Sequence, residues 1–123
     1  MTKAAAMCEF WSSFGLPAYE ENSVPAGDEA PAFPYLTYTF IVGDNNEQVN
    51  INVSLWYRST SWVRANAKAD EIAKGIKERG ALPFDGGGIR LWKGTPFQQD
   101  MADEEDDQIK RVYLNVTAEY III

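Results

Sequence analysis

The residues best suited to chemistry in this chain are five consecutive acids, Asp103, Glu104, Glu105, Asp106 and Asp107. Clustered carboxylates can bind Ca²⁺ or Mg²⁺ through their oxygens. Their spacing differs from that of an EF-hand calcium loop, in which the ligands alternate with other residues and a glycine lies in the middle. Adjacent acids also repel one another when no cation is present. The run is therefore interpreted first as a solvated loop, second as a protein contact and third as a metal site.

Other groups that could support catalysis are scarce. The sequence has no histidine and a single cysteine, Cys8, so neither a Ser/His/Asp nor a Cys/His arrangement can form. Cys8 falls in a predicted helical stripe, and we expect it to be a buried thiol. The run Asp85–Gly88 lacks the Gly-Lys-Ser/Thr of a phosphate-binding loop and is interpreted as a flexible turn into a strand. We therefore expect an interaction or structural protein, not an enzyme, with no cofactor and no bound metal.

A second charged group lies on a helix predicted from about Ser61 to Arg79. Hydroxyl side chains at residues 59–61 can cap its start, and Gly80 is expected to end it in the left-handed conformation. The apolar residues that recur at helical spacing are Trp62, Ala65, Ala69, Ile72, Ala73 and Ile76. The basic residues on the opposite face are Arg64, Lys68, Lys74 and Lys77. This helix therefore carries a net positive charge in a chain whose net charge is negative.

The composition excludes several classes of partner. The net charge of −7 argues against broad binding of nucleic acid and against an anionic membrane surface. No apolar stretch approaches the roughly 20 residues that span a bilayer, and the first residues make a poor signal peptide. At 123 residues, 46% of them hydrophobic, the chain is expected to form one domain over residues 1–123.

The charged residues must be positioned by a small set of elements. The central one is a hairpin predicted over Phe33–Tyr57, in which apolar and polar residues alternate on either side of a turn at Gly43–Asn46. A first helix is predicted over Lys3–Phe14, and its proposed stripe consists of Ala4, Met7, Cys8, Trp11 and Phe14. Val53 and its alternate neighbours on the hairpin are expected to face the core.

Two further strands and two long loops complete the prediction. The strands are Ile89–Lys93 and Gln108–Ile123, and the loops are Ala18–Pro34 and Gly94–Asp107. The element order is then α-β-β-α-β-β. This order favours an α+β fold, a two-layer sandwich in which a mainly antiparallel four-stranded sheet carries two helices on one face.

Several runs of sequence resemble those of a known family. Pro17–Pro25 and Phe33–Tyr38 are similar to segments of the tail-terminator, or tail-completion, proteins, which are minor tail proteins of long-tailed bacteriophages. Trp56-Tyr57 before an amphipathic helix and Leu91–Met101 before the acids agree with this resemblance. It extends over nearly the whole chain. A different head–tail connector or neck protein of similar size is the alternative within this class.

The resemblance implies a helix-flanked sheet that assembles as a hexameric ring on the tail tube. Such a ring ends tube polymerisation and offers a surface for head–tail joining. The implied partners are further copies of the chain, the tail tube protein and a head-completion or connector protein, with DNA passing through without specific binding and no membrane. The implied location is the tail or neck of the virion, after synthesis in the cytoplasm of the host bacterium. The family supplies no catalytic residue.

The charge pattern suggests how copies would meet. A ring needs two different patches in contact, and we expect the acidic run Asp103–Asp107 of one subunit to face the basic helix residues of the next. The two long loops are expected to become ordered in the assembly. From a different class, the alternative is a small acidic cytosolic adaptor or inhibitor that binds one basic partner through the same acids.

Overall fold

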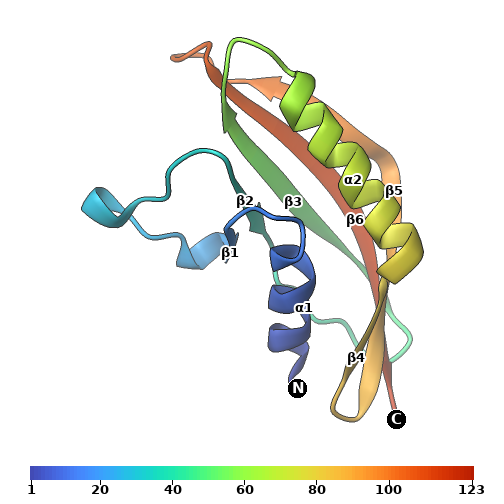
Figure 1. The fold of residues 1–123 in the computed structure, drawn as a ribbon. Coiled ribbons are helices and arrows are strands. Elements are labelled where there is room, and N and C mark those ends of the chain that lie inside the picture. Colours follow the sequence, from blue (N-terminus) through green and yellow to red (C-terminus); the bar gives the residue numbers. More distant parts are fainter.

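The computed structural model describes residues 1–123 and contains one mixed sheet of six strands with two α-helices (Figure 1). The elements are α1 (Lys3–Ser12), β1 (Ala18–Glu20), two 3₁₀ turns (Glu21–Ser23 and Gly27–Glu29), β2 (Tyr35–Tyr38), β3 (Gln48–Arg58), α2 (Val63–Arg79), β4 (Ala81–Phe84), β5 (Gly87–Ala102) and β6 (Ile109–Ile122). The strand order is β1-β2-β3-β6-β5-β4. β1 runs parallel to β2, and the other neighbours are antiparallel.

The predicted four-stranded, antiparallel two-layer sandwich is therefore wrong. β1 and β4 were not predicted, because strands of three and four residues are too short to show alternation. The parallel pairing of β1 with β2 makes the sheet mixed. The long strands β3, β5 and β6 twist as sheets do, and the sheet curls into a half-barrel around the helices (Figure 1).

The middle of the sheet is formed by β3 and β6, which pair along the whole of β3. The predicted alternation is confirmed in both strands. The apolar side chains buried from β3 are Ile51, Val53, Leu55 and Tyr57, and those from β6 are Val112, Leu114, Val116, Ala118 and Tyr120; Ser54 of β3 and Lys110 of β6 are also buried. Burial of each large aliphatic side chain contributes about 1.5–3 kcal/mol. β3 and β6 therefore supply the central part of the hydrophobic core.

Both helices contribute to the same core. The stripe predicted for α2 is confirmed at Ala65, Ala69, Ile72 and Ile76, which are buried. The stripe predicted for the first helix is confirmed at Met7, Trp11 and Phe14, which are buried, and is wrong at Ala4 and Cys8, which are exposed. Ala6 and Phe10 are buried instead, and the Phe10 ring packs edge-to-face on Trp11 at 4.8 Å.

Gly80 ends α2, but not in the predicted left-handed conformation. Its φ angle is −78°. A Cβ atom at this position would lie 2.2 Å from the carbonyl oxygen of Ile76. The carbonyl of Gly80 accepts the Leu91 N–H at 2.7 Å, so the close approach of the helix end to β5 requires the glycine.

The boundaries of two predicted segments also change. The loop predicted over Gly94–Asp107 is wrong over residues 94–102, where β5 continues beyond an irregularity between Lys93 and Gln98. The first hairpin strand ends at Tyr38, so the hairpin is joined by a loop over residues 39–47. The predicted loop Ala18–Pro34 contains β1 and the two 3₁₀ turns.

Candidate interaction surfaces

The acids Asp103–Asp107 form the turn between β5 and β6, which we call the acidic turn. Asp103 Oδ1 accepts the backbone N–H groups of Glu105 and Asp106, at 2.8 and 3.0 Å. Asp106 Oδ1 likewise accepts the Gln108 N–H at 3.0 Å. These bonds are local side-chain caps, which Asp makes readily in turns. The carboxylates therefore build the turn as well as carry its charge.

Asp106 also joins the acidic turn to β3. Its Oδ2 atom lies 2.9 Å from Arg58 Nη1 in an ion pair. The hydrogen bond from Gln108, followed by that from Arg58, holds the pKa of the Asp106 carboxyl below its ordinary value. The acids of the turn that have neither an ion pair nor a side-chain hydrogen bond are Glu104, Glu105 and Asp107.

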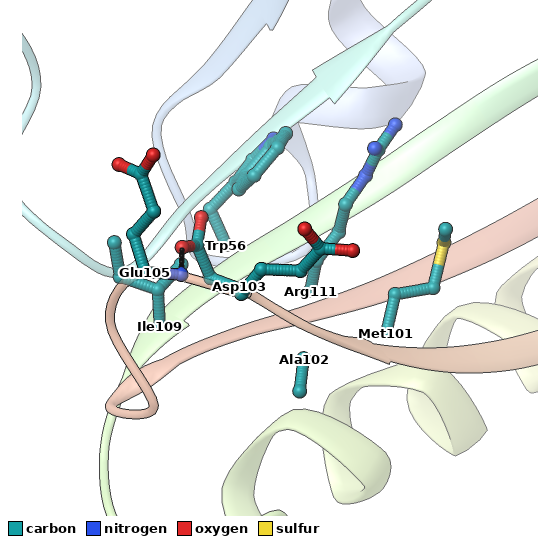
Figure 2. Close-up of a pocket in the computed structure, with 8 residues that line it drawn as sticks. Trp56, Met101, Ala102, Asp103, Glu105, Ile109 and Arg111 are labelled. Carbon is teal, nitrogen blue, oxygen red and sulfur yellow. Dashed lines mark hydrogen bonds between the residues drawn. The ribbon is translucent and has the colours of Figure 1, made fainter.

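A cavity of about 360 Å³ lies beside the acidic turn (Figure 2). Its lining residues are Trp56, Met101, Ala102, Asp103, Glu104, Glu105, Ile109 and Arg111. Figure 2 shows the Trp56 ring and the Arg111 side chain on neighbouring strands, with the acidic turn next to them. The charged groups that line it are three carboxylates and one guanidinium.

The wall of this cavity is part of a stack on the sheet face turned away from the helices. The Arg111 guanidinium lies 4.8 Å from the Trp56 ring centroid and 5.2 Å from that of Tyr113. Its Nε donates to Ser54 Oγ at 3.1 Å, and it makes no ion pair with the acidic turn. Trp56 in turn stacks on Tyr35 at 6.1 Å. Cation–π contacts of this kind hold a charged side chain in a fixed orientation.

The four basic residues predicted on the outer face of α2 differ in their contacts. Lys68 Nζ donates to the Phe14 carbonyl at 2.7 Å and pairs with Glu71 at 2.7 Å, so its charge is satisfied within the chain. The Arg64 guanidinium lies 5.8 Å from the Tyr57 ring centroid. The two remaining basic residues, Lys74 and Lys77, are exposed and make no ion pair.

A hollow of about 170 Å³ lies between α2 and β5. Its apolar lining comes from Ala73, Ile76, Leu91 and Trp92. Its polar lining consists of three cations, Lys77, Arg90 and Lys93, with no acid among them. We call it the cationic hollow. Sequence reasoning found Lys77 but missed the other two cations, because Arg90 and Lys93 lie in β5 and only the pairing of helix with strand brings them beside Lys77.

Residues 21–32, which we call the arm, connect β1 to the aromatic residues before β2. Neither 3₁₀ turn of the arm has a buried residue. Its hydrogen bonds are local, such as Glu29 N–H to the Ala26 carbonyl at 3.4 Å and Ala30 N–H to the Gly27 carbonyl at 3.2 Å. Figure 1 shows the arm projecting from the body on the side away from α2.

The structure brings together only some of the residues that the sequence singled out. The acidic turn and the four basic residues of α2 form no ion pair with one another within the chain. No group of three or more His, Cys, Asp or Glu side chains is arranged so that it could hold a metal ion. Neither helix has the length and apolar character needed to cross a membrane.

The outward-facing stack was missed, although the sequence contained a signal for it. Tyr35, Trp56, Arg111 and Tyr113 occupy the positions that alternate with core residues in their strands. Large aromatic and Arg residues at such positions are typical of contact surfaces. The register that places Trp56 opposite Arg111 is a tertiary feature and could not be deduced from the strand patterns alone.

No family model matches this chain, and no curated protein matches it. A comparison of structures finds a chain from a structure described as "Virion of native gene transfer agent (GTA) particle". The two structures have a TM-score of 0.65 at 18% sequence identity, over 90% of this chain and 83% of the other. The similarity is therefore one of fold, and it extends over almost the whole domain.

Proposed function

We propose that this chain is a structural protein of a tailed, phage-like particle, and that it forms a ring of six copies on the end of the tail tube. The supporting observation is the fold, which is similar over 90% of the chain to that of a chain from a gene transfer agent virion. The similarity to tail-terminator sequences supports the more specific role. In this role the ring ends growth of the tube and joins it to the head connector.

The distribution of charged groups is consistent with assembly rather than catalysis. The cavity beside the acidic turn has carboxylates and a guanidinium but no activated nucleophile. The net charge of −7 disfavours binding of phosphate groups, which suits a ring through which DNA passes without being bound. We therefore assign the protein a binding role without a cofactor, in the tail or neck of the particle.

A ring also requires contacts between unlike patches. The predicted contact between the acidic turn and the basic residues of α2 is one candidate for such a contact. Asp103, Asp106 and Lys68 are already engaged within the chain, so the groups without an ion pair or side-chain hydrogen bond that could form it are Glu104, Glu105, Asp107, Arg64, Lys74 and Lys77.

Native mass spectrometry of the purified protein tests the ring. We expect a dominant species of six copies, seen as a ring by negative-stain electron microscopy. A protein that stays monomeric or dimeric at every concentration, also when mixed with tail tubes, would contradict the proposal and favour a small adaptor. Immunogold labelling of whole particles then locates the chain. Label at the head-proximal end of the tail supports the proposal, and label elsewhere contradicts the terminator role.

A further inference from the structure

We propose that the arm of one copy docks in the cationic hollow of the next copy. This inference rests on the proposed ring and specifies which surfaces form its repeating contact. The occupant of the hollow is a second copy of this chain, through residues 21–32. The arm is acidic, the hollow is basic, and the two lie toward opposite edges of the sheet.

The arm is acidic and its charge is unpaired. It contains Glu21, Asp28 and Glu29 and no basic residue. All three side chains are exposed, and none makes an ion pair. The neighbouring Glu20 differs, since its carboxylate accepts the Asn22 N–H at 2.9 Å. The arm thus presents three free carboxylates on a segment whose hydrogen bonds to the body reach no further than the adjacent Glu20.

The cationic hollow has the complementary character. Lys77, Arg90 and Lys93 make no ion pair. The carboxylate directly across the strands from Arg90 is that of Glu119, which instead accepts Gln48 Nε2 at 3.3 Å. Arg90 lies 5.5 Å from the Trp92 ring centroid and Lys93 lies 5.7 Å from that of Phe97, but none of the three cations has an acidic partner in the chain. Charge complementarity of this kind orients partners and raises the rate at which they associate.

The positions of the two surfaces determine the type of assembly. The arm follows β1 at one edge of the sheet, whereas the hollow lies on β5 between Arg90, the last residue that pairs with β4, and Lys93. Four strand spacings, roughly 19 Å, separate β1 from β5. Figure 1 shows the arm and α2 on opposite sides of the molecule. The contact is therefore heterologous, and each copy that joins has a free arm or a free hollow until a ring closes.

Apolar contacts would add to the charge contacts between the arm and the hollow. Pro25 and Pro31 restrict the backbone of the arm, which lowers the entropy lost when it becomes ordered. Trp92, 38% exposed at the rim of the hollow, offers a flat apolar surface next to the cations. The arm would place its acids on the cations and its prolines and alanines on this rim.

Charge neutralisation tests the contact against the alternative in the acidic turn. The first variant is Glu21→Gln, Asp28→Asn and Glu29→Gln together. The matched control removes the same charge from the free acids of the turn, with Glu104→Gln, Glu105→Gln and Asp107→Asn together. We expect the arm variant to weaken assembly about tenfold in sedimentation velocity, and the control to assemble as the wild type does. Unchanged thermal melting of both variants shows that the subunit itself is intact.

Cross-linking gives a second, direct readout. In a Cys8→Ser background, which removes the exposed native thiol, the pair Glu29→Cys and Lys77→Cys should form disulfides between subunits on mild oxidation. A ladder of covalent oligomers up to the ring size is expected. The pair Glu104→Cys and Lys77→Cys is the control and should stay monomeric on a denaturing gel.

The outcomes separate this inference from the proposed function. If the ring persists after neutralisation of the arm, or cross-links through Glu104 instead of Glu29, the arm contact is wrong. The proposed ring itself is then not contradicted. A wild-type protein that forms no ring overturns both. A weakened arm variant that regains assembly when Lys77→Glu and Arg90→Glu are combined with Asp28→Lys and Glu29→Lys supports the inference.

Discussion

The arm and the acidic turn carry the same kind of charge but are held in different ways. In the acidic turn, Asp103 caps the backbone and Asp106 is paired with Arg58 of β3. In the arm, no acid makes an ion pair and every hydrogen bond is local. The denser cluster of acids is thus the one that stabilises its own subunit. Charge density along a sequence does not by itself identify an interface, whereas charge left without a partner is a better indicator.

The largest effect on stability is expected for a substitution in β3, the strand to which the acidic turn is joined. Val53 is fully buried opposite Leu114. Val53→Asp places an unpaired charge in the core at a cost of several kcal/mol, comparable with a total stability of about 5–15 kcal/mol. Circular dichroism should show no cooperative melting. Asp28→Asn in the arm is the control and should melt as the wild type does; native melting of the Val53 variant would show that the core face is misassigned.

A smaller effect is expected within the acidic turn. Asp103→Ala removes the acceptor of two backbone N–H groups and should lower the free energy of unfolding by about 1–2 kcal/mol. Glu104→Gln changes the adjacent acid, which has no hydrogen-bond partner, and should leave the free energy of unfolding unchanged. Urea unfolding of the two variants measures the difference. Equal stabilities would mean that Asp103 does not hold the turn.

The smallest effect is the dependence of stability on pH through Asp106. Its pKa is lowered in the folded state, so its contribution is present above the ordinary pKa of an aspartate and is lost as the pH falls through the folded value. The melting temperature of Asp106→Asn should lie below that of the wild type near neutral pH and approach it as the pH falls through the lowered pKa of Asp106. Asp107→Asn has no ion pair to lose and should follow the wild type at every pH. A constant gap for Asp106→Asn would contradict the Arg58 pair.

The elements predicted correctly are those in which local pattern and burial agree. In β6, apolar residues alternate from Val112 to Tyr120, and every one of them is buried. In α2, the small residues Ala65 and Ala69 let the helix lie close to the sheet. The pattern failed in β5, where Gly94-Thr95-Pro96 interrupts the alternation and the strand resumes after an irregularity in its pairing with β6. A strand whose register shifts in the middle is recognised only through its partner.

The candidate surfaces were predictable only in part. The acids of the turn are evident in the sequence, but their bonds to Arg58 and to the backbone depend on the meeting of β3 and β6. The exposed position of Cys8 depended on how three aromatic residues packed, which helical spacing does not specify. The cationic hollow required the docking of α2 on β5. Each miss is a contact between elements distant in the chain.

The unequal lengths of the strand pairings have a mechanical consequence. β6 is held by eleven residue pairs to β3 and twelve to β5, whereas β1 is held by three pairs to β2. Tension applied to a subunit through its arm would reach the three pairs of β1 first. Those pairs would separate at low force and release a short length of chain. The long strand pairings around β6 would share the load and stay intact. A subunit built in this way can yield at its edge under tension without unfolding its core.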